Sequence, residues 1–378
     1  MRQEQKSVIV VADTHFGLKK KNQVCDPAAF SSFLNFVKFL EKGGKTEISL
    51  GVWGSSEKSL AIHPPETIIF LGDMLELWDA SSKSIDASTR YIVQQLFELN
   101  CRKIYVLGNH DYDLLEISGD YPFGSSKITI TSEEATVTKG EKNYLFLHGQ
   151  QFDSLFALPT WQFMSPIRHA ALAFASYSWI FVILFFADLL FEIVYGIKGV
   201  VDVAVLALLG SISIPFLIMK FGRNVWNKIK TTKYKPKKAE KNAENWWRKF
   251  SKEKYLTGNF NIVYGHTHLI DFWRKADSKE SLTFWNIPSW IRDHNKKKQV
   301  DLEQVFRHAF LYIHDEGCEF IGWDTKQKKP FLIPKEVILE KRQSGDLTRF
   351  EIYEIEDNLR EIGWPQELIN KWMKYNPL

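Results

Sequence analysis

The sequence predicts an α/β fold whose main body is interrupted by an inserted apolar helical hairpin. Two observations lead to this prediction. Short apolar, β-branched runs alternate with segments of helical periodicity in the first part of the chain. Two uncharged runs, of 18 residues at 170–187 and of 17 residues at 203–219, then break the pattern. A length of 378 residues suits one large domain with such an elaboration.

The elements of the main body can be read in chain order. Residues 7–12 form an apolar, β-branched run that predicts the first strand, and residues 27–42 carry apolar side chains at helical spacing. A second helix is expected at 87–100, and a short amphipathic helix within 357–375. Further strands are expected at 67–71, 103–107, 127–131, 135–139, 143–147, 261–264, 282–287, 308–313 and 319–323.

The composition is that of a folded globular protein. Hydrophobic residues make up 45% and charged residues 25%, which excludes a disordered or fibrous chain. Three widely spaced cysteines cannot form a complete disulfide framework, and no Cys-x-x-Cys pair indicates a structural zinc site. We therefore expect a reducing compartment. The first seven residues are polar, so we expect no cleaved signal peptide.

The insertion combines the two apolar runs with a basic collar at residues 220–254. As helices, the runs would reach about 25–27 Å, just under the roughly 30 Å hydrocarbon thickness of a bilayer. The collar has 13 Lys and Arg against 3 Glu, an excess of +10. Because the whole chain carries +4, the remainder carries −6. The sequence thus predicts a mildly acidic body with an apolar hairpin and a strongly basic flank.

Three interpretations of the hairpin are open. The preferred one is a membrane-embedded hairpin, whose basic flank places both of its ends on the cytoplasmic side. A hairpin lying in one leaflet is the second, because the runs are short and Gly210 and Pro215 interrupt one of them. A buried soluble core or dimer interface is the third. The collar itself is read as this flank, with recognition of anionic headgroups as the alternative.

Polar residues that can bind metal ions follow five predicted strands. They are Asp13 and His15, then Asp73, then Asn109, His110 and Asp111, then His148, and finally His266 and His268. Carboxylate, imidazole and amide groups suit divalent ions such as Mn, Fe, Co, Ni or Zn. Gly72, Gly108 and Gly265 precede three of these sets and allow close backbone approach in tight turns. One such residue alone would be an ordinary turn residue, whereas five sets at strand ends predict a metal centre.

In content and order, these blocks resemble the calcineurin-like metallophosphoesterase superfamily. The blocks are Asp13-x-His15, Gly72-Asp73, Gly108-Asn109-His110-Asp111, His148-Gly149 and Gly265-His266-Thr267-His268. They cover about residues 7–150 and 260–325. The resemblance implies a four-layer αββα metallophosphoesterase sandwich that carries the apolar helical hairpin as an insertion.

The resemblance also implies a centre with two divalent metal ions. One ion would be held by Asp13, His15, Asp73 and His268, and the other by Asp73, Asn109, His148 and His266, with Asp73 bridging. Manganese is the ion expected first, with Fe, Co, Ni and Zn as alternatives. His110 would stabilise the transition state or protonate the leaving oxygen, and Asp111 would orient its ring. An Asx turn is the alternative role for Asp111.

Residues near two blocks are similar to the UDP-2,3-diacylglucosamine pyrophosphatase branch. Residues 72–79 read Gly-Asp-Met-Leu-Glu-Leu-Trp-Asp and lack the Asp-Arg-Gly of protein serine/threonine phosphatases. Residues 285–290 read Trp-Asn-Ile-Pro-Ser-Trp, which also resembles that branch. The chain departs from the lipid A enzyme at His110, where Arg is expected. The branch implies a lid that holds acyl chains between the fourth and fifth blocks, which is where the apolar hairpin lies.

These inferences assign 1–155 and 256–330 to the metallophosphoesterase domain, 156–255 to the membrane-directed insertion, and 331–378 to a C-terminal extension. The predicted function is hydrolysis of a phosphomonoester or pyrophosphate of a membrane lipid or lipid-linked nucleotide. The bilayer is the expected partner, the catalytic domain is expected on the cytoplasmic side, and no nucleic acid is expected. One alternative is a metal-dependent nuclease or phosphodiesterase, for which Trp246, Trp247 and Arg248 are a hint. The other alternative is a membrane scaffold that has lost activity.

Overall fold

The structure is a computed structural model that describes residues 6–19, 23–49, 59–77, 80–152, 236–276, 281–293, 307–335 and 338–339. The predicted apolar hairpin, the beginning of the basic collar and the helix expected within 357–375 lie outside these residues. The chain divides into two compact units, Met1–Phe152 with Ala243–Leu378, and Asp153–Asn242. Apart from 236–242, every described residue belongs to the first unit.

An eight-stranded mixed sheet organises the first unit. Its strands lie in the order β17-β16-β15-β1-β5-β6-β8-β7. They are β1 (Ser7–Val11), β5 (Pro65–Leu71), β6 (Arg102–Val106), β7 (Gly119–Phe123), β8 (Ser126–Thr131), β15 (Ala309–His314), β16 (Gly317–Asp324) and β17 (Lys329–Ile333). The strands β1, β5, β6 and β8 are parallel, so their carboxyl ends meet at one edge of the sheet.

A second sheet has five strands in the order β12-β13-β11-β10-β9. They are β9 (Ala135–Lys139), β10 (Lys142–Phe146), β11 (Phe260–Tyr264), β12 (Asp271–Ala276) and β13 (Ser281–Asn286). Because β10, β11 and β13 are parallel, their carboxyl ends also share an edge. Two small antiparallel pairs complete the described strands, β2 (Gln23–Cys25) with β14 (Ile291–Asp293), and β3 (Thr46–Ser49) with β4 (Ser59–Ile62).

The helices are α1 (Pro27–Glu41), α2 (Ser82–Glu98) and α5 (Pro236–Glu253), with short 3-10 turns η2 (Tyr112–Ile117) and η3 (Gln150–Phe152). At the start of α1, the Asp26 carboxylate accepts a hydrogen bond from the Ala29 amide at 3.1 Å. The Ser81 hydroxyl caps α2 in the same way through the Ser84 amide at 3.2 Å. This cap starts α2 earlier in the chain than its apolar spacing predicts.

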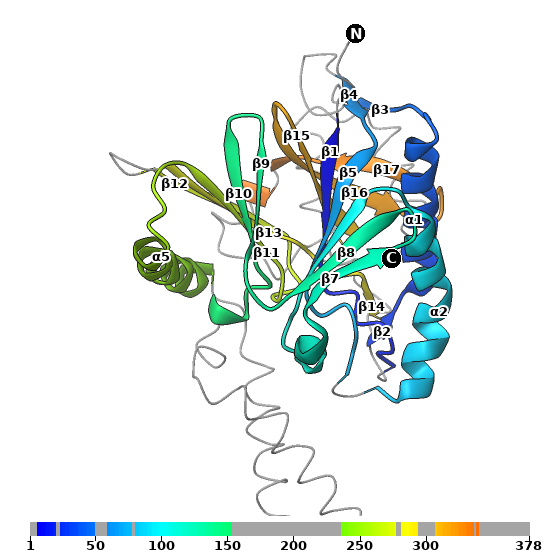
Figure 1. Cartoon of the computed structure of the whole chain (residues 1–378). Helices are drawn as coiled ribbons and strands as arrows, with labels where there is room; N and C mark the ends of the chain where they lie inside the picture. The colour runs from blue at the N-terminus through cyan, green and yellow to red at the C-terminus, as the bar shows by residue number, and fades with distance from the viewer. Residues whose placement is uncertain are drawn as a thin grey trace, which may run out of the picture. The chain divides into compact units, whose positions relative to one another are not determined.

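Three apolar cores separate four layers. Val10 of β1, Phe146 of β10 and Trp285 of β13 belong to the core between the two sheets. The opposite side of β1, with Ile9, packs against Phe33 of α1, which follows from the two-residue period of a strand. A third core joins α5 to the outer face of the five-stranded sheet. Figure 1 shows α1 and α2 beside one sheet and α5 beside the other.

The α/β class predicted from the sequence is confirmed, with mixed sheets of the expected elements. The described strands that were not predicted are β2, β3, β4, β7, β12, β14 and β17, and β17 crosses the boundary expected at 330/331. The end of the basic collar is helical in α5, and from Ala243 onward this helix belongs to the first unit. Within the part of the chain that the structure describes, no helix is both long and apolar enough to cross a bilayer.

Candidate metal centre

The polar residues predicted from the sequence follow strands of both sheets. Asp13 lies after β1, Asp73 after β5 and Asn109 after β6, all in the eight-stranded sheet. His148 follows β10 and His266 follows β11 of the five-stranded sheet. The structure brings these strand ends together, because parallel neighbours in each sheet end at the same edge. The site is therefore built across the two sheets.

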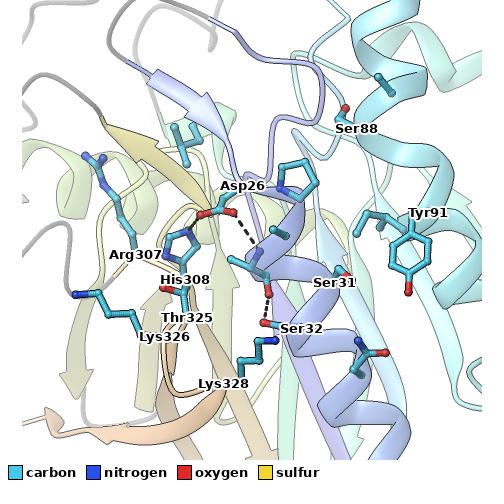
Figure 2. A pocket seen from close by; sticks show the side chains of 17 residues that line it. Asp26, Ser31, Ser32, Ser88, Tyr91, Arg307, His308, Thr325, Lys326 and Lys328 are labelled. Carbon is cyan, nitrogen blue, oxygen red and sulfur yellow. Dashed lines mark hydrogen bonds and ion pairs between the residues drawn. The ribbon is translucent and has the colours of Figure 1, made fainter. Parts of the chain in front are cut away.

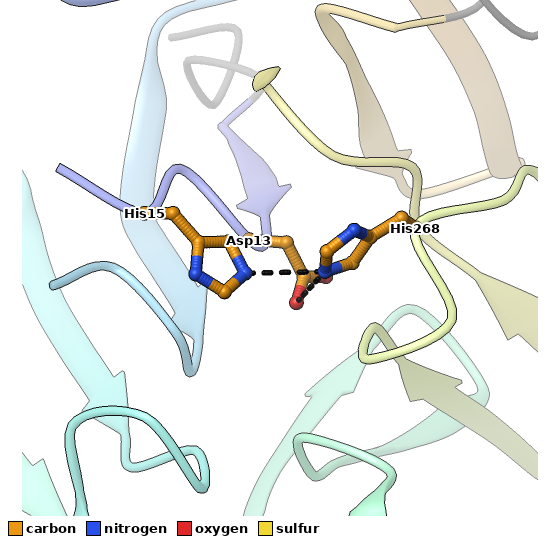
Figure 3. A group of neighbouring side chains, drawn as sticks. All are labelled: Asp13, His15 and His268. Carbon is orange, nitrogen blue, oxygen red and sulfur yellow. Dashed lines mark hydrogen bonds and ion pairs between the residues drawn. The ribbon is translucent and has the colours of Figure 1, made fainter. Parts of the chain in front are cut away.

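Asp13, His15 and His268 form the first group of potential ligands. One ligand atom from each lies within 4.8 Å of the others. His15 Nε2 is 3.1 Å from His268 Nε2, and His268 Nε2 is 3.6 Å from Asp13 Oδ1. In Figure 3 the two rings face each other beside the carboxylate. Residues that are 253 positions apart in the sequence thus meet at one point.

Asp73, His148 and His266 form the second group, again with ligand atoms within 4.8 Å of one another. His148 Nε2 lies 3.3 Å from Asp73 Oδ2 and 3.3 Å from His266 Nδ1. Asn109 Oδ1 is 3.2 Å from the same nitrogen. The other ring nitrogen of His148 donates to the Leu71 carbonyl at 2.7 Å, which holds the ring in place.

Asp73 lies between the two groups. Its Oδ2 is 3.3 Å from His148 Nε2 and 3.7 Å from His15 Nε2. Its Oδ1 accepts a hydrogen bond from the His110 amide at 2.8 Å, so the carboxylate is fixed by the backbone of a neighbouring loop. The position of Asp73 matches that of a bridging ligand.

The backbone at this site adopts conformations that are uncommon for residues with side chains. Five site residues have positive φ: Asp13 at 52°, His15 at 44°, Asp73 at 50°, His266 at 71° and His268 at 62°. Such clustering is typical of functional sites, where the surrounding fold stabilises it.

Two glycines make the close packing of the loops possible. A Cβ on Gly72 would lie 2.5 Å from His148 Nδ1, and Gly72 itself has a φ of +68°. A Cβ on Gly108 would lie 2.3 Å from Asp73 Oδ1. A side chain at either position would therefore clash with a residue of the site, which explains why glycine precedes both Asp73 and Asn109.

The donor set fits divalent metal ions. Asp13 Oδ1 is buried and has no hydrogen-bond partner, and the nitrogens of His15 and His268 point at one another at 3.1 Å. A lone pair on each of these atoms can be satisfied by a shared cation. Asp13, His15, Asp73 and His268 would hold one ion, and Asp73, Asn109, His148 and His266 the other. Divalent ions bound there would lower the pKa of a shared water and offset charge on a phosphoryl group.

The two groups differ in their electrostatics. Burial would lower the pKa of His148, but the adjacent Asp73 outweighs it and raises this pKa to about 10. Burial works against ionisation of Asp73 too, yet His148 and His110 hold its pKa well below the ordinary value. In contrast, burial lowers the pKa of His15 and of His268. Neutral imidazoles are the form that binds metal.

Glu76 is a site residue that the sequence did not single out. It is 1% exposed, with Oε2 3.0 Å from His15 Nδ1 and Oε1 2.8 Å from His110 Nδ1. Burial opposes its ionisation, but its hydrogen bonds with the two histidines hold its pKa below the ordinary value. The sequence signal was present, because this acid stands three residues after Asp73 in the loop that follows β5.

His110 lies against Glu76 at the edge of the centre, with 15% of its side chain exposed. Burial lowers its pKa, but the charges of Asp73 and Glu76 prevail and raise it. A raised pKa favours the protonated form of the ring, the form that can donate a proton. The acid role that the resemblance implies for His110 stays a prediction.

Asp111 has different partners from those expected. Its Oδ1 accepts from the Gly108 amide at 2.6 Å, and its Oδ2 accepts from the Met74 amide at 2.8 Å and from the Tyr105 hydroxyl. Burial and the charge of Asp73 raise its pKa to about 6. Asp111 thus ties the loops after β5 and β6 together, and Glu76 is the carboxylate that orients His110.

Comparison with known proteins supports this interpretation of the site. Residues 6–179 match the family described as calcineurin-like phosphoesterase. The first part of the chain is thus similar to calcineurin-like phosphoesterases. This family uses divalent metal ions and indicates a hydrolase that acts on phosphoester bonds.

No curated protein sequence matches. Among solved structures, wild-type Vps29 in complex with Zn²⁺ from Entamoeba histolytica aligns with a TM-score of 0.28 at 10% identity. That alignment covers 83% of this chain and 90% of the Vps29 chain.

Two aromatic residues that hinted at nucleic-acid binding lie in the core of the phosphoesterase unit. Trp247 is 3% exposed, and Trp246 stacks on Phe250 with ring centroids 4.6 Å apart. Trp247 belongs to the core under α5, and the partly buried Trp246 packs against it. The burial of Trp247 weakens the sequence hint of base stacking at this residue.

Proposed function

We propose that this protein is a metal-dependent phosphohydrolase with a dinuclear site that cleaves a phosphomonoester or pyrophosphate of a membrane lipid or lipid-linked nucleotide. The observation that carries the hydrolytic part is the position of Asp73 Oδ2 between His148 and His15. A shared carboxylate between two ligand groups is what a two-metal hydrolase requires. Manganese is the proposed ion, because the site mixes carboxylate, amide and imidazole ligands.

The proton chemistry is supplied by the Glu76–His110 pair. A departing alkoxide or phosphate oxygen needs a proton, and His110 is a partly exposed ring next to the centre. Glu76 fixes the tautomer and the direction of that ring through Nδ1. Phosphoester and pyrophosphate bonds both release an oxygen that this arrangement can protonate.

The lipid part of the proposal is supported by the insertion. Residues 170–187 and 203–219 contain no charged residue, and they lie between the fourth and fifth metal-binding blocks. The insertion follows His148 in the sequence, and the described chain resumes with α5, which precedes β11 of the five-stranded sheet. An apolar insertion there would present a lipid whose scissile phosphate lies at headgroup level.

The helix α5 supports an anionic bilayer as the partner. It packs Ala243, Trp247 and Phe250 against the phosphoesterase unit. Its cations Arg248, Lys249 and Lys252 are exposed, as is Lys254 directly after it. A basic surface attracts anionic lipid by about 1 kcal/mol for each Lys or Arg close to it. We propose that the catalytic domain lies on the cytoplasmic side, where basic flanks of membrane segments are retained.

A substrate comparison tests the function. The purified full-length protein with Mn²⁺ is assayed on p-nitrophenyl phosphate, on long-chain lipid phosphates and lipid-linked nucleotides in detergent, and on their short-chain analogues. We expect kcat/KM for long-chain substrates to exceed that of short-chain analogues by about tenfold or more, from added apolar contact. Equal kcat/KM values for long-chain and short-chain substrates would refute the proposed lipid substrate but not the proposed hydrolase activity. No turnover of any substrate by metal-loaded protein would refute the hydrolase.

Membrane association is tested separately. Membranes are washed with high salt and then with alkaline carbonate, and the protein is followed in the soluble and pelleted fractions. Retention after both washes is expected for an embedded insertion. Release by salt alone would show that binding is only electrostatic and would contradict embedding.

A further inference from the structure

A cavity lies over the beginning of α1, away from the metal centre. Its volume is about 930 Å³, within the size of small-molecule sites. None of the seven predicted metal ligands lines it. In Figure 2, Arg307, Lys326 and Lys328 lie on one side of α1, and Ser88 and Tyr91 on the other. The cavity is thus bordered by several separate parts of the fold.

The side of the cavity that faces the strands is cationic. Arg307 precedes β15, whereas Lys326 and Lys328 belong to the turn between β16 and β17. Asp26 is the one carboxylate among the described lining residues, and it lies 3.1 Å from the Ala29 amide and 3.6 Å from His308 Nε2. The first turn of α1 also lines the cavity, and a helix N-terminus adds positive potential. Among the described residues that line the cavity, three carry a permanent positive charge and one is a carboxylate.

The other side of the cavity suits an uncharged organic group. Tyr91 is 60% exposed, so its ring is available for stacking. Ala28 and Ala87 contribute small apolar surfaces next to it, and the Ser31 and Ser88 hydroxyls can donate or accept hydrogen bonds. Cationic side chains thus lie on one side of α1, and the uncharged side chains of Ser88 and Tyr91 lie on the other.

We infer that this cavity binds a small molecule in which a phosphate group is joined to a planar or apolar part. The phosphate lies against Arg307, Lys326 and Lys328, whose donors match phosphate oxygens. The planar or apolar part lies against Tyr91 and the alanines. This site is independent of the proposed hydrolase activity, so either could fail without the other.

Calorimetric titration tests the site. The full-length chain carrying Asp73→Asn is titrated at low salt with α,β-methylene-ADP, a non-hydrolysable probe, so that the metal centre competes little for it. His268→Ala provides a second background. Adding Lys326→Ala and Lys328→Ala should weaken binding by about tenfold or more, because two charged contacts to phosphate are lost. The matched control is Lys42→Ala with Lys45→Ala, two exposed lysines outside the cavity.

The control pair should leave affinity unchanged, and inorganic phosphate should bind more weakly than the probe. The inference is overturned if neither background binds millimolar probe, or if the control pair weakens binding as much as the cavity pair. Inorganic phosphate binding as tightly as the probe would overturn the role of Tyr91 and the apolar wall.

Discussion

Glu76 Oε1 lies 2.8 Å from His110 Nδ1, while the other oxygen of the same carboxylate lies 3.0 Å from His15 Nδ1. One buried acid therefore orients both a potential metal ligand and the histidine that we propose as the proton donor. Hydrogen bonds from a carboxylate to the far nitrogen of such rings fix their tautomer and raise their basicity. The two functions of the centre are coupled through this residue.

Replacing Glu76 with Gln should lower kcat by about 10–100-fold, the usual effect of losing such a supporting carboxylate. Because Glu76 helps to raise the pKa of His110, its loss should lower that pKa. If His110 acts as the acid, the alkaline limb of the kcat/KM profile then moves to lower pH. Steady-state kinetics across pH measure both effects.

Glu47→Gln is the control for this experiment, since Glu47 is an exposed acid on β3. It should leave the rate and the pH profile unchanged. A Glu76→Gln enzyme with normal kcat and an unshifted profile would show that His110 does not depend on this carboxylate.

Gly72→Ala should destabilise the fold by about 1–3 kcal/mol and weaken metal binding, because it combines strain with a clash. Its φ is +68° and a Cβ would approach His148 Nδ1 to 2.5 Å. Gly43→Ala is the matched control, with a φ of +86° and nothing within 4 Å of a Cβ. This variant should lose about 1 kcal/mol of folding stability from backbone strain alone, and its metal binding should be unchanged. Denaturant melts measure the loss of stability in each variant, and metal analysis measures the metal that each retains. Equal metal content in both variants would argue against a clash between a Cβ at position 72 and His148.

Asp73→Asn should abolish most of the stabilisation that metal provides. Because Asp73 lies between both ligand groups, its loss weakens each, and the metal-dependent rise in Tm shrinks. Thermal melts with and without Mn²⁺ measure this. Asp86→Asn, on the exposed side of α2, is expected to behave like the wild type. The bridging position would be wrong if Mn²⁺ raised the Tm of Asp73→Asn as much as that of the wild type.

Metal binding should release a proton from His148. Without metal, Asp73 raises the pKa of this ring to about 10, so the ring is protonated at neutral pH. A metal ion must displace that proton, and affinity therefore falls as pH falls, by about tenfold per unit for one proton. Calorimetry in buffers of different ionisation enthalpy counts the protons. If the buffer took up no proton on metal binding, His148 would not be the protonated ligand that we expect.

Local pattern was enough to predict much of the fold. The residues of β1 are apolar and β-branched, and α1 places Phe30, Phe33 and Val37 on one buried side. Such periodicity follows from backbone geometry and needs no partner. The strand β12 was not predicted, because Asp271–Ala276 includes charged residues and pairs at a sheet edge.

The candidate site was predictable as a set of residues, but its contacts were not. Asp111 stands next to His110 in the chain, which made it the expected orienting acid. Its carboxylate instead accepts from Gly108 and Met74. Glu76 takes that place because the loop after β5 carries it beneath two histidines from other strand ends. Chain neighbours often point apart where the backbone turns sharply.

The sequence by itself determined the α/β class, the residue types of a metal centre and the position of an apolar insertion, since composition, periodicity and short motifs are local properties. Only the tertiary structure decided that Asp73 lies between two ligand groups, that Glu76 joins His15 to His110, and that Trp247 is core. These relationships join residues far apart in the chain. They depend on which strands are neighbours and on how two sheets pack, and neither is encoded in any single segment.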